Sequence, residues 1–484
     1  MPCVLQRFFR LNERGTSVVQ EIRGGVVTFV TMAYIVVLNP LILGSLDPAS
    51  PSAKRDVLGM TLSVPQVAAV TALVAGVMTI LFGLIANFPF AMATGLGINT
   101  LVAVTIAPQV TWPEAMGLVV VNGVIIVILG LTGFRTAVFN AIPDPLKIAI
   151  AAGIGAFIAF IGFVDAGFVR RLPDAANTTV PVGLGIEGSI ASWPTAVFCV
   201  GLLLTVVLVA RRVRAGILLG VLGTTVLAIV VEAIVQAGPS NGTNPTGWNL
   251  GYPGLPSSIV SVPDLSLVGD VSLGAFVRLP ILAVTLLVFS LVLANFFDAM
   301  GSMTGLGRQA GLLDENGQLP NIGRALVVEG AGAVAGGAAS ASSNTVFVES
   351  ASGIAEGART GLANIVTGVL FLVAMFFTPL YEVVPVEAAA PALVVVGALM
   401  MSGVRDIEWS EFSVALPVFL TIVVMPFTYS IANGIGAGFI SWVVLAAATG
   451  RARTVHPLMW VVALAFVLYF AVTPLRALIL IGLG

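Results

Sequence analysis

Long apolar runs separated by short polar connections dominate the chain. Most runs approach the ~20 residues that a helix needs to span the hydrocarbon core of a bilayer. In the first half they fall near 24–45, 65–88, 95–108, 113–133, 145–168, 193–210 and 214–237. In the second half they fall near 277–301, 322–339, 349–358, 359–382, 388–403, 412–431, 433–449 and 457–480. This pattern predicts an all-α polytopic membrane protein.

A polar stretch at 238–276 separates the two series. It is rich in Gly, Pro, Ser and Asn, and its only charged residues are Asp264 and Asp270. Seven crossings in each half would invert the second half relative to the first, as in inverted-repeat secondary transporters. We therefore predict about 14 transmembrane segments in a 7+7 inverted repeat. One surplus apolar run leaves the number of C-terminal spans, and the side of the C-terminus, open.

The positions of Lys and Arg indicate an orientation, because these residues concentrate in cytoplasmic connections. Arg212 precedes the seventh run, and Arg308 and Arg324 follow the polar stretch, which itself contains no Lys or Arg. We expect 238–276 to be extracytoplasmic and the N-terminus to be cytoplasmic, in a multi-pass protein of the cell membrane. Residues 1–23 are predicted to form a cytoplasmic amphipathic lead-in.

Two of the apolar runs are interrupted. Residues 88–108 read FPFAMATGLGINTLVAVTIAP, and 340–361 read SASSNTVFVESASGIAEGARTG. Each stretch predicts a short extended piece, rich in β-branched and aromatic residues in the second case, followed by a half-helix. Non-helical backbone cannot face lipid, because its polar groups would lack partners. We therefore expect the extended pieces, in spans 3 and 10, to pair and their half-helices to point at a shared cavity.

Composition gives weight to the acidic residues inside these runs. Only 9% of the residues are charged, against about 25% in soluble proteins, and a carboxylate deep in a bilayer is costly and usually functional. Asp298 and Glu349 are the prime candidates, although either could merely cap a helix. Asn295 lies on the helical face of Asp298. Asn99 lies in the first interrupted run, where it could instead tie down irregular backbone.

Three further residues are candidates for the same site. Phe90 and Phe347 flank the breaks and could cover a flat ring, although core packing is an equally good reason for an aromatic residue there. Glu329 could serve in a proton relay or have a structural role. The lone His456 cannot supply an HExxH metal motif, and an aspartyl protease needs a second deep Asp. We predict no enzyme activity, no metal or other cofactor, and no nucleic-acid partner.

The sequence around these residues resembles that of the AzgA-like purine permeases, a branch of the nucleobase–cation symporter group related to the uracil and xanthine permeases. The resemblance covers nearly the whole chain. It is carried by NERGTSVVQEIRGGVVTFVTMAYIVVLNP, FAMATGLGINT, NFFDAMGSMTGLGRQAGLLDENGQLPNIGRAL, SSNTVFVESASGIAEGARTGL and HPLMW.

The resemblance implies proton-coupled import of adenine, guanine or hypoxanthine by alternating access. It also implies a core domain at 24–133 and 277–382 and a gate domain at 134–237 and 383–484. It places the site at Asn99, at acidic positions of the eighth span and at Glu349. Relatives commonly carry two Asp three residues apart in that span, and here the first is Asn295.

A purine presents N–H donors that a carboxylate accepts strongly, and an Asn side chain both donates and accepts. The hypothesis is that Glu349 is the main purine ligand and Asp298 the proton carrier, with the reverse assignment as the closest alternative. A channel or anion exchanger on the same fold is the other alternative. Carboxylates at the crossing disfavour an anionic substrate. The predicted partners are a purine nucleobase, protons and the lipid bilayer, and a homodimer is compatible with the sequence.

Overall fold

The computed structural model describes most of the 484-residue chain. The residues that it does not describe are 1, 46–47, 49–52, 133–140, 172–181, 214, 241–243, 250–252, 256–257, 315–318, 321 and 483–484. The boundary predicted between 133 and 134 lies outside the described residues.

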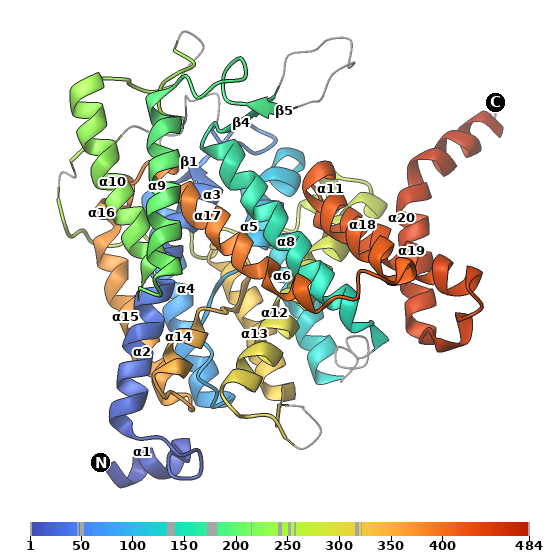
Figure 1. The fold of residues 1–484 in the computed structure, drawn as a ribbon, viewed down its shortest axis with the longest axis horizontal. Helices are drawn as coiled ribbons and strands as arrows, with labels where there is room; N and C mark the ends of the chain where they lie inside the picture. The colour runs from blue at the N-terminus through green and yellow to red at the C-terminus, as the bar shows by residue number, and fades with distance from the viewer. Residues whose placement is uncertain are drawn as a thin grey trace.

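Helices make up most of the described chain (Figure 1). Those of the first half are α1 (Pro2–Phe9), α2 (Val18–Met32), α3 (Ile35–Leu43), α4 (Val64–Ile85), α5 (Leu96–Thr100), α6 (Trp112–Leu131), α8 (Asp144–Asp165), α9 (Trp193–Ala210) and α10 (Gly216–Val235). Those of the second half are α11 (Ala275–Arg278), α12 (Ile281–Gln309), α13 (Ile322–Ala338), α14 (Ser350–Ala355), α15 (Leu362–Ala374), α16 (Thr378–Glu382), α17 (Val386–Met400), α18 (Phe412–Thr428), α19 (Ile431–Ala448) and α20 (Pro457–Gly482).

Most of the helices coincide with the predicted apolar runs. Within the described residues, 9 helical stretches are long and apolar enough to cross a membrane, and shorter apolar helices cover Leu96–Gln109, Ile281–Phe296, Phe412–Thr428 and Pro457–Ala471. The chain therefore has a mostly helical, polytopic membrane fold.

Short strands pair in three places. Strand β3 (Met92–Thr94) pairs antiparallel with β6 (Asn344–Val346), so that Ala93 lies opposite Thr345. This pairing confirms the prediction that the two interrupted runs contain extended pieces lying side by side. The other pairs are β1 (Gly44–Ser45) with β2 (Leu62–Ser63), and β4 (Val169–Arg171) with β5 (Val182–Leu184).

A first helix group surrounds the β3–β6 pair. In this group α6 packs on α13, α15 packs on α4 and α2, α14 packs on α2, and α12 contacts α6 and β6. Glycines allow backbones to approach closely here. A Cβ added to Gly123 of α6 would lie 2.5 Å from the backbone N of Val334, and one on Gly330 of α13 would lie 2.8 Å from that of Val127. Helix α13 is thus pressed between α6 and β6.

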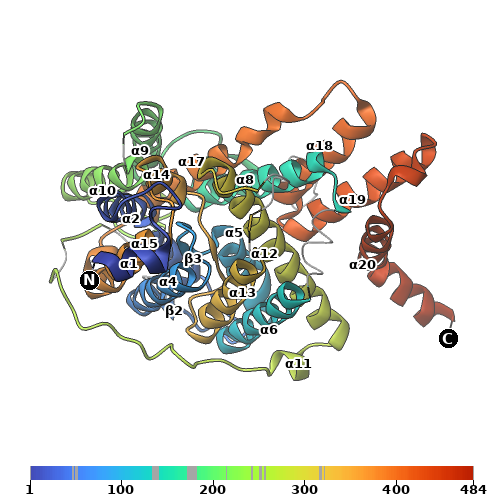
Figure 2. The same cartoon turned by 90° about the horizontal axis from the view of Figure 1, so that it is seen from below.

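A second helix group contains α8, α9, α10, α17, α18 and α19. Helix α8 packs on α17 and α18, α9 packs on α10 and α17, and α18 packs on α19. Close approach again depends on glycine, since a Cβ on Gly155 of α8 would lie 2.5 Å from the carbonyl oxygen of Gly397. Helix α20 packs on α19 and lies at the edge of the molecule (Figure 2).

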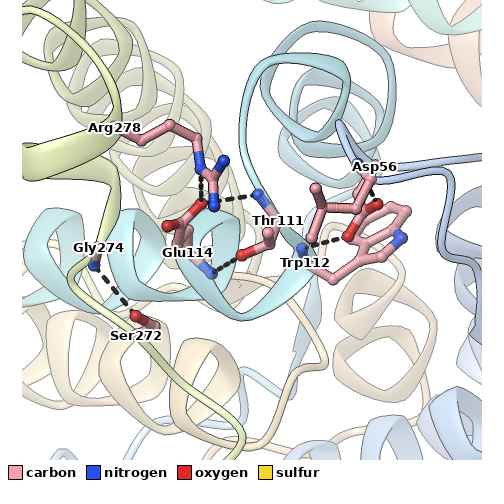
Figure 3. A network of polar contacts seen from close by, with 8 residues as sticks. Asp56, Thr111, Trp112, Glu114, Ser272, Gly274 and Arg278 are labelled. Atoms are coloured by element: carbon pink, nitrogen blue, oxygen red, sulfur yellow. Dashed lines mark hydrogen bonds and ion pairs between the residues drawn. The ribbon is translucent and has the colours of Figure 1, made fainter.

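A polar network fastens the start of α6 (Figure 3). The hydroxyl of Thr111 accepts from the N–H of Glu114, whose carboxylate accepts from the N–H of Thr111. Arg278 of α11 donates to the same carboxylate at 2.7 Å. Asp56 accepts from the N–H of Trp112 at 3.1 Å. Three segments far apart in the sequence are therefore joined at this end of the first helix group.

A second polar cluster joins the two helix groups. Lys54, in the connection between α3 and α4, lies 3.2 Å from the carboxylate of Asp165 at the end of α8. The side chain of Asn249 donates to the carbonyl of Asp165 at 2.8 Å, and its backbone N–H donates to Glu387 of α17 at 2.9 Å. The polar stretch between the halves thus reaches the same place.

Candidate functional site

The site is built around the strands β3 and β6. Side chains alternate between the two faces of a strand, so Asn344 and Thr345 point to opposite sides. A Cβ added to Gly332 of α13 would lie 3.4 Å from the Cβ of Asn344, whereas one on Gly95 would meet the Thr345 methyl group at 3.1 Å. One face of the pair therefore packs on α13. The other is the face at which Gly95 opens helix α5.

Helix α12 brings two of the predicted residues to the Gly95 face. The fully buried Asn295 donates from Nδ2 to the hydroxyl of Ser343 at 3.1 Å. Asp298 follows on the same helical face, and a Cβ on Gly95 would lie 3.2 Å from its Oδ2. The carboxylate of Asp298 therefore lies where β3 ends and α5 begins.

Glu349 immediately precedes α14, as the sequence predicts. The hydroxyl of Tyr34, at the junction of α2 and α3, donates to its Oε1. The hydroxyl of Thr31 contacts its backbone carbonyl at 3.5 Å. Tyr34 is fully buried and Glu349 is half-buried, so the carboxylate is held from the inside of the first helix group.

Two further carboxylates act on Asp298. The carboxylates of Glu329 and Glu349 interact electrostatically with that of Asp298. Glu329 is fully buried on α13. Like charges in a poorly solvated region repel strongly, so such a group gains free energy by taking up a proton or by binding hydrogen-bond donors.

Asn99 supplies a neutral polar group on α5, the helix that begins beside Asp298. It lies on α5, it is fully buried, and neither its Oδ1 nor its Nδ2 has a hydrogen-bond partner among the described residues. The hydroxyl oxygen of Thr345 also has no hydrogen-bond partner among the described residues. Buried polar atoms are nearly always hydrogen-bonded in the working protein. The unpartnered atoms of Asn99 and Thr345 therefore indicate a position for a ligand or water.

The two aromatic candidates have packing contacts. The ring of Phe90 stacks on Phe88 with centroids 5.2 Å apart and lies 6.3 Å from Phe82. The ring of Phe347 is buried, and its backbone N–H extends the strand pairing by donating to Ala91 at 3.0 Å. These contacts give both residues a structural role, and we leave them out of the ligand contacts proposed below.

Sequence reasoning missed two residues of this site, Tyr34 and Thr345. Tyr34 is the only tyrosine in the first apolar run, and Thr345 alternates with the apolar Val346, so both offered a weak signal. Within the described part of the chain, no group of three or more His, Cys, Asp or Glu residues is arranged to hold a metal ion.

Comparison with solved structures identifies the fold. The transmembrane domain of the cyanobacterial bicarbonate transporter BicA superposes with a TM-score of 0.59 at 14% identity, covering 87% of this chain and 96% of that one. SLC26A9 superposes with a TM-score of 0.55 at 11% identity, covering 89% and 66%. At such low identity the similarity concerns the fold alone.

Comparison of sequences identifies the family. The guanine/hypoxanthine permease PbuG of Bacillus subtilis is 40% identical over 473 residues, which cover 96% of this chain and 99% of that protein. The adenine permease AdeQ of Escherichia coli is 35% identical over 469 residues, covering 96% and 95%. A model of the Permease family, Xan_ur_permease, matches residues 19–437. These matches confirm the resemblance seen in the sequence, and the chain belongs to the permease family of the uracil and xanthine permeases.

Proposed function

We propose that the chain imports adenine, guanine or hypoxanthine across the cell membrane by alternating access, coupled to protons. Relatives named as guanine/hypoxanthine and adenine permeases align with at least 95% of this chain, which supports a purine substrate. The observation that carries the proposal is the β3–β6 crossing, around which Asp298, Glu349 and the unpartnered amide of Asn99 are placed.

Purine recognition is assigned to Glu349 and Asn99. An ionised carboxylate accepts N–H donors from the ring edge in charge-assisted hydrogen bonds. The Asn99 amide offers one donor group and one acceptor to the remaining edge, and its lack of a hydrogen-bond partner among the described residues supports this role. Asn295 is already bonded to Ser343, so we assign it to holding β6 in place beside the substrate.

Proton coupling is assigned to Asp298, with Glu329 as a relay. Coupling needs a group that changes its charge between the two states of the cycle. Asp298 lies beside Gly95, where α5 begins, and two other carboxylates, Glu329 and Glu349, act on its charge. Protonation of Asp298 would remove the repulsion between these carboxylates and Asp298 when the substrate site is occupied. An exchange of roles between Asp298 and Glu349 is the alternative that the experiment below separates.

The arrangement proposed for the whole molecule is 14 spans in a 7+7 inverted repeat. The first helix group would form the core domain (24–133 and 277–382), and the second would form the gate domain (134–237 and 383–484). The packing of α6 with α13, and separately of α8 with α17, supports two bodies that move relative to each other. The N-terminus is assigned to the cytoplasm.

Uptake into proteoliposomes tests this function. We expect labelled purine to accumulate when the outside is acidic and to stop accumulating when a protonophore is added. Unlabelled adenine, guanine and hypoxanthine should compete, whereas sulfate and bicarbonate should not. Competition by the anions alone would overturn the proposal in favour of an anion exchanger.

Two variants separate the roles of the carboxylates. We expect Asp298→Asn to abolish accumulation against a gradient while retaining exchange of internal for external purine. We expect Glu349→Gln to lose binding itself. Normal gradient-driven, pH-dependent accumulation by Asp298→Asn would assign the proton to another group.

A further inference from the structure

We propose that Tyr34 is the positioning residue of the substrate site, because its hydroxyl fixes the carboxylate of Glu349 before a ligand arrives. The inference deepens the proposed function and rests on it. Tyr34 touches Glu349 and is not assigned a contact with the substrate. Its role is to set the direction and charge state in which Glu349 meets the substrate.

The bond comes from a part of the chain that is far away in sequence and rigid in space. Tyr34 and Glu349 are 315 positions apart, and the phenol O–H donates to Oε1. Tyr34 lies between the last residue of α2, Met32, and the first of α3, Ile35, so both helices limit its movement. Its ring is fully buried. A buried ring with a polar tip is found where the tip has a partner, and here that partner is Glu349.

The backbone of Glu349 lies against the end of α2. The hydroxyl of Thr31 donates to the carbonyls of Val27 and Thr28 at 3.0 Å and lies 3.5 Å from the carbonyl of Glu349. Nearer the N-terminus of α2, this helix is in close contact with α14, since a Cβ on Gly24 would lie 2.9 Å from the carbonyl oxygen of Gly353. Tyr34, Thr31 and α14 therefore belong to one packed unit, and Glu349 does not need the substrate in order to be placed.

The chemistry of the donor determines what Glu349 can do. A phenol O–H that points at Oε1 favours an oxygen that accepts, and the carboxylate also receives its own backbone N–H. With two donors from the protein, Glu349 presents an acceptor to the substrate. The site therefore selects a ring edge with an N–H and rejects an edge with only acceptor atoms, because that edge would leave two acceptors facing each other.

The test uses Tyr34→Phe, which keeps the ring and removes the hydroxyl. We expect the KM for the best-transported purine to rise about 10-fold, the size of one hydrogen bond to a charged group, with the maximal rate within about twofold. The matched control is Tyr381→Phe. The hydroxyl of Tyr381 donates to the carbonyl of Ala374 at 2.8 Å on α15, and its loss should leave KM unchanged.

A double-mutant cycle separates positioning from packing. Glu349→Asp keeps the charge but shortens the side chain, so the carboxylate no longer reaches Tyr34. Adding Tyr34→Phe to Glu349→Asp should then change KM by less than about twofold, because the interaction is already lost. An equal 10-fold effect in both backgrounds would make Tyr34 a packing residue and overturn the inference.

The remaining outcomes are also decisive. An unchanged KM in Tyr34→Phe, with purine uptake by the parent protein intact, overturns the inference and leaves the proposed function standing. Absence of purine uptake by the parent protein overturns the proposed function, and the inference with it. The melting temperature in detergent is measured for each variant, and a rise in KM counts only where that temperature is unchanged.

Discussion

The two interrupted crossings have similar backbones and different chemistry. Each consists of a short strand followed by a short helix, β3 with α5 and β6 with α14. The first break holds only a neutral amide, Asn99, which is fully buried and has no partner among the described residues. The second holds a carboxylate, Glu349, which is half-buried and tied to Tyr34.

The segments that follow the two breaks also differ. After α5 the chain continues through a π-helical turn at Leu101–Ile106 and a 3-10 turn at Ala107–Gln109. After α14 it reaches Arg359, whose guanidinium donates to the carbonyls of Ile354 and Ala358. A paired backbone thus brings the two breaks together, while the side chains that they carry differ: a carboxylate bonded to Tyr34 in one and an amide without a partner among the described residues in the other.

The largest effect is expected at the charged break. Glu349→Gln keeps the shape and removes the charge, so we expect the ratio of maximal uptake rate to KM to fall about 100-fold. The matched control is Glu356→Gln in the same segment, where the carboxylate pairs with the exposed Arg23. The side chain of Glu356 is 10% exposed and lies at the end of α14 opposite Glu349, so its loss should lower the melting temperature and leave uptake within about twofold of the parent. Equal effects at Glu349 and Glu356 would remove the distinction between the breaks.

An intermediate effect is expected at the neutral break. Asn99→Ala removes a donor and an acceptor that the protein does not use, so KM should rise about 10-fold with no loss of thermal stability. Asn39→Ala is the contrasting control. Asn39 donates to Thr71 at 2.7 Å and to the carbonyl of Ala341 at 3.1 Å, so its loss should lower the melting temperature. A fall in stability for Asn99→Ala, with KM unchanged, would assign Asn99 to the scaffold.

The smallest effect is expected from the strands themselves. Thr345→Val removes a hydroxyl on the Gly95 face and should raise KM roughly threefold, the size of a weak neutral hydrogen bond. Thr94→Val removes a hydroxyl that is equally buried and that has no partner in the part of the chain that the structure describes. It shares the face of Asn344, which packs on α13, so KM should not change. A larger effect of Thr94→Val than of Thr345→Val would place the substrate on the other face of the pair.

The breaks and several helices could be predicted from sequence because local chemistry decides them. Gly95 interrupts the apolar stretch at 88–108, and consecutive β-branched and aromatic residues from Thr345 to Val348 mark β6. The run predicted at 193–210 matches α9, which is Trp193–Ala210 and begins with Ser192 accepting from the N–H of Thr195. The N-cap, the proline at the start of the helix and the length of the apolar run all indicate the same helix.

Other features depend on contacts that the local sequence does not contain. The first apolar run is two helices, α2 and α3, with a junction at Tyr34, and hydropathy is high on both sides of it. Helix α12 continues to Gln309, past the predicted end at 301, and its last turns pack against Leu319, since a Cβ on Gly307 would lie 2.6 Å from that side chain. The bond from Tyr34 to Glu349 joins opposite halves of the chain, so neither residue signals the other.

The ion pair between Lys54 and Asp165 has a consequence for the proposed transport cycle. It bridges the two helix groups beside the point where Asn249 reaches Glu387. If the two helix groups move relative to each other, as the proposed transport cycle requires, this ion pair has to break. The side chains of Lys54 and Asp165 are 19% and 10% exposed, so separating them would leave two charges in a poorly solvated place and would cost more than breaking a surface ion pair. A cycle in which the two groups separate here therefore needs water or another charged group to reach both partners as the pair opens.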